Sequence, residues 1–282
     1  MDKAFVFVNL TINFDYYGVN NGIAYLVPIL RKNGYNVFCI HLTSEISKED
    51  FKLRVESLKS KYKDLILGFS VTSHQLKFLE KYSNSITELD VLQIAGGPAC
   101  TLDPLTVLKY SSLDAVCIGE GEKPLEELLV TLQDGTNIRE TKGFVWRKNN
   151  GHFPQDIDPV KSSPSFMKCL DKLEYPDYSI FPMEYIIRKN RVRLTLSRGC
   201  PYNCTYCCNS ALVSVYKGSH GYFRVPLVDW AIGLFKKIKA EYPEVKEFRI
   251  DDDFLTANKK WFIEFATRYS REVQIPYYIN VR

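Results

Sequence analysis

The sequence predicts an α/β protein whose first half is built around a parallel β-sheet. Short, nearly continuous apolar runs alternate with helical stretches over the first 135 residues, and turn or polar residues flank each run. Strands that are buried on both faces give such continuous runs. The pattern therefore predicts an open, doubly wound parallel sheet with helices on both faces.

The elements expected in this half follow one another as strand and helix. The strands are expected at Ala4–Asn9, Asn36–His41, Leu65–Ser70, Val91–Ala95 and Ala115–Ile118, and helices at Gly22–Lys32, Lys48–Tyr62 and Glu122–Leu132. We expect a flavodoxin-like (Rossmann-like) strand order, in which ligands bind at the carboxyl ends of the strands.

Between residues 136 and 190 this pattern breaks. The segment Gly143–Phe153 reads as a hairpin around Asn149-Asn150-Gly151. A run punctuated by prolines follows, and it should be extended and lie on the surface. We therefore expect one domain at 1–135, a linker at 136–190 and a second domain at 191–282.

Strand and helix signals return after residue 190. Strands are expected at Val192–Leu196, Glu247–Asp251 and Gln274–Arg282, and helices at Val228–Tyr242 and Asn258–Tyr269. The first of these helices has apolar residues on one face and lysines on the other, which is typical of an amphipathic helix with a solvated side.

Composition limits the class of protein. The chain has 282 residues, of which 45% are hydrophobic and 25% charged, so it can build ordinary cores. The eight cysteines are too unevenly spread for a disulfide framework. The N-terminus lacks signal-peptide features and no apolar run is long enough to span a membrane, so we expect a cytoplasmic, reduced protein. A formal net charge of +4 with no basic block gives no clear nucleic-acid patch.

The most informative motif follows the strand expected at Val192–Leu196. Cys200, Cys204 and Cys207 form a C-x3-C-x2-C pattern. Three thiolates on one loop can hold three irons of a cubane 4Fe–4S cluster and leave the fourth iron open to a small molecule. Zinc is the competing metal, with Cys208 as a nominal fourth ligand, but adjacent cysteines suit one zinc ion poorly. A third interpretation is that these are ordinary buried thiols.

This cysteine motif, with Tyr206 before the third cysteine, resembles that of the radical S-adenosylmethionine (SAM) enzymes. The resemblance implies the first half of a (β/α)6 partial TIM barrel, with SAM bound to the open iron near Tyr206. It also implies that the loop after the second barrel strand helps to bind the SAM amino group. Asp251, Asp252 and Asp253 occupy that loop, although they also suit a charged turn before a helix.

The loops after three strands of the first half carry a second resemblance. The phrases AGGPACTLDP and DAVCIGEGEKPLEEL, together with LEYPDY in the linker, resemble the cobalamin (B12)-dependent branch of the radical SAM family. The resemblance implies cobalamin bound at the carboxyl ends of these strands, where glycines allow a bulky ligand to approach the backbone. The residues implied in cobalamin binding are Ser70, Thr72, Gly96, Gly97, Pro98, Gly119 and Glu120.

One departure concerns the cobalt ligand. Many cobalamin-binding domains have a D-x-H-x-x-G motif after the first strand, but the loop from Asn9 to Gly18 has no histidine. His41 and His74 follow other strands, and we interpret them as loop-edge or surface residues. We therefore expect cobalamin without a lower histidine ligand from this domain. Asn13, Tyr16 and Tyr17 are expected to line its lower face.

The resemblance implies reductive cleavage of SAM and methyl transfer to an unactivated carbon, or a related radical reaction. It also implies an electron donor such as flavodoxin or ferredoxin and a small-molecule or natural-product substrate. One alternative is a methylthiotransferase with a second cluster, for which only Cys39, Cys100 and Cys117 are available in the first half. Another is a non-catalytic cobalamin-binding module, since only three of about six barrel strands are expected and the chain would then be a fragment.

Overall fold

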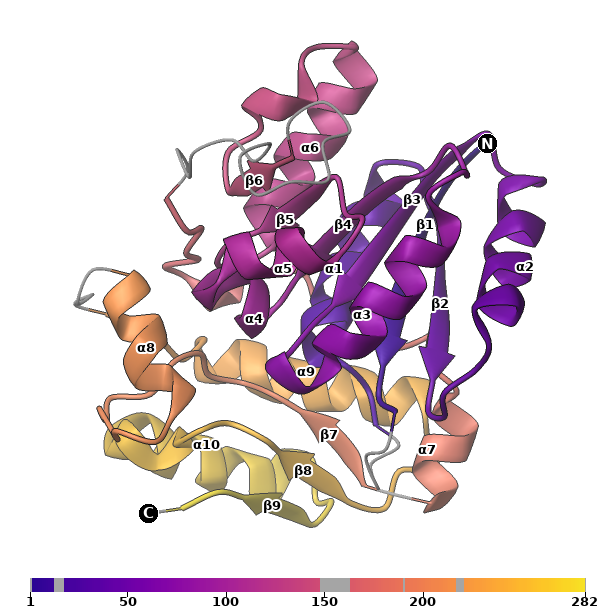
Figure 1. Ribbon diagram of the computed structural model, residues 1–282. Helices are drawn as coiled ribbons and strands as arrows, with labels where there is room; N and C mark the ends of the chain where they lie inside the picture. Colours follow the sequence, from indigo (N-terminus) through magenta and orange to yellow (C-terminus); the bar gives the residue numbers. More distant parts are fainter. Residues whose placement is uncertain (1, 13–17, 148–162, 190, 217–220, 282) are drawn as a thin grey trace. The chain divides into compact units, whose positions relative to one another are not determined.

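The chain folds into two compact units (Figure 1). The computed structural model describes residues 2–12, 18–147, 163–189, 191–216 and 221–281. The first unit consists of Met1–Tyr16 and Gly22–Phe166, and the second of Tyr17–Asn21 and Met167–Arg282. Each unit has its own sheet and its own core. In the part of the chain that is described, no helix is long and apolar enough to cross a membrane.

The first unit is built on a six-stranded sheet. Its strands are β1 (Lys3–Leu10), β2 (Asn36–Leu42), β3 (Asp64–Ser70), β4 (Leu92–Gly96), β5 (Ala115–Cys117) and β6 (Phe144–Trp146). The spatial order is β2-β1-β3-β4-β5-β6, and the first five strands are parallel. This confirms the predicted flavodoxin-like order, which places all five carboxyl ends at one edge of the sheet.

Helices cover both faces of this sheet (Figure 1). They are α1 (Asn21–Lys32), α2 (Lys48–Lys59), α3 (Leu76–Ser83), α4 (Pro98–Leu102), α5 (Pro104–Tyr110) and α6 (Glu122–Asp134), with single 3-10 turns η1 (Ser73–Gln75), η2 (Asn84–Ile86) and η3 (Ile138–Glu140). Val6 and Val8 of β1 share a core with Phe51 of α2 and Tyr82 of α3. Successive side chains alternate across a strand, so the buried Phe7 lies on the opposite face.

Strand β6 closes one edge of the sheet. It pairs antiparallel with β5, with Ala115 opposite Trp146. Next to it, the buried guanidinium of Arg147 donates to the carbonyl oxygens of Leu113 and Ser111 at 2.9 and 2.7 Å. This strand lies in the segment predicted as a linker with a hairpin. It joins the sheet because the free edge of β5 offers its backbone a partner. The turn expected at Asn149–Gly151 lies outside the described residues.

The second unit contains three parallel strands, which confirms the expected start of a βα-repeat barrel. The strands are β7 (Val192–Leu194), β8 (Phe248–Ile250) and β9 (Tyr277–Ile279), and the helices are α7 (Met183–Lys189), α8 (Cys208–Val215), α9 (Val228–Glu241) and α10 (Lys259–Glu272), with 3-10 turns η5 (Leu170–Lys172) and η6 (Leu255–Ala257). At the core, the ring of Phe235 lies 4.9 Å from both Phe248 and Tyr269. Both distances suit aromatic packing.

Candidate functional site

The three cysteines of the motif lie on one loop between β7 and α8. Cys207 is the residue before the first turn of α8, and its N–H donates to the carbonyl of Cys204 at 3.0 Å. All three side chains are partly exposed. Burial raises the pKa of the Cys200 thiol, and the neighbouring Asp253, Cys207 and Cys204 raise it further. The three thiols therefore lie near one another and near a carboxylate.

A second segment clamps this cysteine loop. Arg198 and Arg224 exchange two backbone hydrogen bonds of 2.9 Å. Gly199 lies between Arg198 and Cys200 in the sequence, and it adopts a φ of 78°. A Cβ at this position would collide with the backbone of Tyr222. Glycine is thus required here by the chain's own packing, and the loop is held before any ligand arrives.

Asp252 anchors the other side of the loop. Its two carboxylate oxygens accept the N–H groups of Leu196 and Ser197 at 2.7 and 2.5 Å. The residue is only 2% exposed, and burial raises its pKa to about 6. With both oxygens engaged below the surface, Asp252 supports the framework. This placement differs from the SAM contact that the resemblance implied for it.

The two flanking aspartates have different environments. Asp251 forms ion pairs with Arg193 and, at 2.8 Å, with Arg249. Asp253 is exposed, and it accepts a hydrogen bond of 3.0 Å from Asn209 at the start of α8. Asp252 therefore holds the start of the cysteine loop, and Asp253 is the exposed aspartate that contacts the helix at its end. The ring of Tyr206 is 91% exposed, so it is open to a ligand.

The donors on this loop are three thiols, of which a cubane cluster would use one for each of three irons. Among the described residues, no group of three or more His, Cys, Asp or Glu side chains is placed to hold one metal ion, as a tetrahedral zinc site would need. A cubane makes a different demand, because each thiolate binds an iron of its own. Three partly exposed thiols on one clamped loop, with an amide N–H beside Cys207, fit that demand.

The loops implied in cobalamin binding come together at the carboxyl edge of the first sheet. Ser70 pairs with Gly96, and the N–H of Val71 donates to the carbonyl of Gly96 at 2.9 Å. Gly119 follows the neighbouring strand β5. These loops, which include Thr72 and Glu120, are partly exposed, and Pro98 beside them is exposed. The edge is therefore open to a ligand.

The glycines of these loops have a local explanation that sequence reasoning missed. Gly97 has a φ of 112°, and a Cβ there would lie 2.6 Å from the carbonyl oxygen of Val71. Gly119 has a φ of 84°, and its Cβ would lie 2.5 Å from the backbone of Ser165. At both positions the protein's own backbone occupies the space that a side chain would need. Close approach of a ligand is thus not needed to explain either glycine.

Thr101 is a second feature that the sequence did not reveal. Its buried hydroxyl donates to the carbonyl of Gly97 at 3.1 Å and accepts the N–H of Gly119 at 3.0 Å. One side chain thereby links the loops after β4 and β5. In the sequence, the signal for such a role is a polar residue within a short, mostly apolar helix. The sequence does not show that its hydroxyl bonds to Gly97 and Gly119, because only the fold brings these residues together.

His41 and His74 lie on different elements of the first unit: His41 is a partly buried residue within β2, and not at a loop edge as expected, whereas His74 lies in η1. The Nε2 of His41 lies 2.9 Å from the hydroxyl of Thr11, and burial lowers the pKa of the imidazole. His74 is exposed in the 3-10 turn η1 after β3. Asn13, Tyr16 and Tyr17 lie outside the described residues, so their expected place below cobalamin stays a prediction.

The cysteines of the first unit lie on three separate elements. Cys39 is in β2, Cys100 in α4 and Cys117 in β5. Burial raises the pKa of Cys39 and Cys117 to about 12 and raises that of Cys100 as well. These thiols resemble packed core residues more than cluster ligands.

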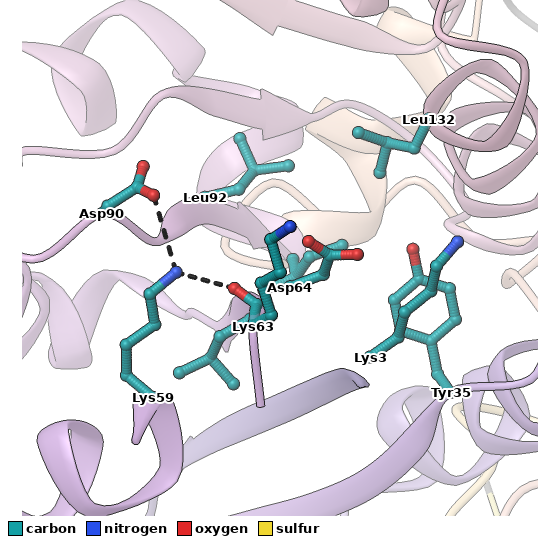
Figure 2. Close-up of a pocket in the computed structure, with 10 residues that line it drawn as sticks. Lys3, Tyr35, Lys59, Lys63, Asp64, Asp90, Leu92 and Leu132 are labelled. Carbon is teal, nitrogen blue, oxygen red and sulfur yellow. Dashed lines mark hydrogen bonds and ion pairs between the residues drawn. The ribbon is translucent and has the colours of Figure 1, made fainter. Parts of the chain in front are cut away.

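A cavity of about 260 Å³ lies at the opposite, amino edge of the first sheet (Figure 2). Lys3, Lys63 and Asp64 line it, and Lys59 bridges to Asp90 at 3.6 Å on its rim. Ligands of doubly wound sheets bind at the carboxyl ends of the strands. This cavity is therefore distinct from the candidate cofactor edge.

Comparison with known proteins identifies the class of the first unit. Residues 8–129 match the model of the B12-binding domain family. With this domain followed by the cysteine loop, the chain resembles the cobalamin-binding radical SAM proteins, as the motifs predicted.

Individual relatives agree with this class. The chain is 27% identical over 260 residues to an uncharacterized methyltransferase of Pyrococcus horikoshii, a match that covers 89% of this chain and 52% of the relative. Its fold is similar to that of the radical SAM methyltransferase TsrM from Kitasatospora setae, with a TM-score of 0.71 and 15% identity over 96% of this chain and 52% of TsrM. It is also similar to the cobalamin-dependent radical SAM enzyme OxsB, with a TM-score of 0.75 and 19% identity over 98% of this chain and 38% of OxsB. The chain thus spans about half the length of the curated relative.

Proposed function

We propose that this chain is the cofactor-binding part of a cobalamin-dependent radical SAM enzyme of the methyltransferase kind. The observation that carries the proposal is the clamped loop with Cys200, Cys204 and Cys207, in a chain whose residues 8–129 match the B12-binding domain family. When bound, the 4Fe–4S cluster would supply the electron that cleaves SAM, and cobalamin would carry the methyl group. An electron donor such as flavodoxin or ferredoxin and a small-molecule or natural-product substrate complete the proposed reaction.

The residues around the cysteine loop have distinct proposed roles. The three thiolates hold the cluster, and the exposed ring of Tyr206 offers a flat surface to the adenine of SAM. The carboxylate of Asp253 is exposed beside the loop and accepts hydrogen bonds from the SAM amino group. Asp251 lies beside Asp253 in the same loop, and its ion pairs with Arg193 and Arg249 balance its negative charge.

Cobalamin is proposed to bind at the carboxyl edge of the first sheet. Ser70, Thr72, Gly96 and Glu120 are partly exposed there and offer hydroxyl, backbone and carboxylate groups to its amide side chains. Gly97, Pro98 and Gly119 shape the same edge. The loop after β1 has no histidine and the Nε2 of His41 is hydrogen-bonded to Thr11, so the lower cobalt position is proposed to lack a histidine ligand from this domain.

Anaerobic reconstitution with iron and sulfide tests the cluster. We expect about four irons per chain and loss of the cluster absorbance when Cys200, Cys204 and Cys207 are replaced together by alanine. Cys169→Ala is the matched control, because its thiol is exposed and belongs to no proposed ligand set. Cys208→Ala separates the metals, because it removes the nominal fourth zinc ligand and should leave the iron content unchanged. A folded wild-type chain without iron, or a triple variant that keeps it, would contradict the proposal.

The same preparation separates the alternatives. About eight irons per chain would favour a methylthiotransferase-like protein with a second cluster. Binding of cobalamin with no SAM cleavage would favour the non-catalytic module. Electron paramagnetic resonance of bound cob(II)alamin tests the lower ligand: we expect an unchanged spectrum in His41→Ala and His74→Ala.

A further inference from the structure

Asn209 is a buried polar residue at the start of the helix that follows the cysteine loop. It lies in the first turn of α8, two residues after Cys207, and is 5% exposed. Its Nδ2 lies 3.6 Å from the Sγ of Cys207 and 3.0 Å from the Oδ2 of Asp253. Its Oδ1 accepts the hydroxyl of Tyr222 at 3.0 Å.

This network determines the orientation of the amide. An ionised carboxylate only accepts hydrogen bonds, so the Asp253 oxygen must face the nitrogen of Asn209. The amide nitrogen has two hydrogens, one for Asp253 and one for the sulfur of Cys207. The hydroxyl of Tyr222 then donates to the remaining oxygen. A flipped amide would face Asp253 with an oxygen, so one N–H is directed at the sulfur.

An N–H directed at a ligand sulfur has a definite electronic effect. A hydrogen bond to a cluster thiolate stabilises negative charge on the sulfur, and a reduced cluster carries one more electron than an oxidised one. The donor therefore favours the reduced form and raises the reduction potential. The negative charge of Asp253 has the opposite effect, because its carboxylate lies 3.0 Å from the same Asn209 nitrogen that faces the Cys207 sulfur.

We propose that Asn209 is a positioning residue that holds the Cys207 side chain by an N–H···S bond and thereby sets the reduction potential of the cluster. This inference rests on the proposed function, because it requires the cluster. The Nδ2 of Asn209 contacts both the sulfur of Cys207 and the carboxylate of Asp253, which have opposite effects on the reduction potential. A stronger N–H···S bond would raise the reduction potential of the cluster, and a weaker one would lower it.

The test is a potentiometric titration of the reconstituted full chain, followed by electron paramagnetic resonance. We expect Asn209→Leu and the near-isosteric Asn209→Asp to bind iron as the wild type does but to have a lower potential. Ser210→Ala is the matched control, because its hydroxyl donates to the Cys207 carbonyl at 2.7 Å rather than to the sulfur. Its potential should equal that of the wild type.

A double-variant cycle separates the two partners of Asn209. If the amide acts through the sulfur, the shift caused by Asn209→Leu persists when Asp253 is also replaced by asparagine. A shift that vanishes in the Asp253→Asn background, or an unchanged potential in both Asn209 variants with normal iron content, would overturn the inference. Should Asn209→Leu not fold, Asn209→Ala takes its place, because it also removes the amide without adding a charge. A wild-type chain without iron would instead refute the proposed function and the inference together.

Discussion

A single buried carboxylate joins the ends of β7 and β8. Asp252 accepts two backbone N–H groups from the strand end that leads into the cysteine loop, while Asn280 donates to its carbonyl oxygen at 3.0 Å. Burial raises the pKa of its carboxyl from 3.8 to about 6. The folded state therefore binds this proton more tightly than the unfolded state does. The raised pKa of Asp252 therefore adds to the free energy of unfolding at low pH. This contribution is complete below pH 3.8 and is lost as the pH rises through about 6.

Asp252→Asn tests this residue. Between pH 4 and pH 7 the wild-type free energy of unfolding should lose on the order of 2–3 kcal/mol because of Asp252, and the variant should lack this loss. Urea unfolding at both pH values measures the slope. Asp90→Asn, at an exposed carboxylate, serves as the control and should keep the wild-type slope. Parallel slopes for wild type and Asp252→Asn would contradict the assignment.

Gly97 shows how much a single absent Cβ matters. Gly97→Ala combines a left-handed φ of 112° with a collision against the carbonyl oxygen of Val71. Gly135 has a φ of 68° but nothing within 4 Å of its Cβ position, so Gly135→Ala adds strain alone. We expect a loss of about 1 kcal/mol for Gly135→Ala and ~3 kcal/mol or more for Gly97→Ala. Thermal unfolding would measure both, and equal losses would refute the collision.

At the scale of elements, the sequence predicts best the strands and helices whose formation depends on local composition. Strands β1 to β5 were expected within a few residues, because buried parallel strands are continuous apolar runs. Helices α3, α4 and α5 have eight, five and seven residues, which is too short for a clear helical period, and they were not named. Strand β6 depends on pairing with distant β5, which no local signal shows.

The same division holds for the candidate site. The three cysteines are evident from their spacing alone. Asn209, Tyr222 and Thr101 were missed, because their roles arise from contacts between segments that only the fold brings together. Asp252 was expected at a ligand and is buried instead, since a charged run does not reveal which carboxylate faces inward. Geometry was needed to separate the three aspartates.

The clamp on the cysteine loop gives a prediction at this scale. Gly199→Ala should displace the segment at Tyr222 and distort the loop, so we expect bound iron to fall by at least about half. Gly221→Ala is a close control, because its φ is 89° but nothing lies within 4 Å of its Cβ position. Iron analysis after reconstitution compares them. Equal iron contents would show that the clamp is not needed for cluster binding.

At the scale of the whole molecule, each compact unit supplies one candidate cofactor site from its own elements. The first unit offers the carboxyl ends of β3, β4 and β5, and the second offers the loop between β7 and α8. Each set of loops is held by internal contacts, such as Thr101 in one and the Arg198–Arg224 bridge in the other. Both candidate sites are therefore formed within one unit, and loops that are already ordered lower the conformational cost of binding a ligand.

Hydrogen exchange of the full chain tests this division. Aquacobalamin at about a hundredfold excess over its dissociation constant should stabilise the state that binds it by about 2.7 kcal/mol. We expect slower exchange at residues 70–72, 96–101 and 118–122, and no change at residues 59–64 beside the amino-edge cavity (Figure 2). Reconstitution with iron and sulfide should instead slow exchange at residues 196–210. Protection by cobalamin at the amino edge, with none at the carboxyl edge, would contradict the placement, because parallel strands present their ligand loops at only one end.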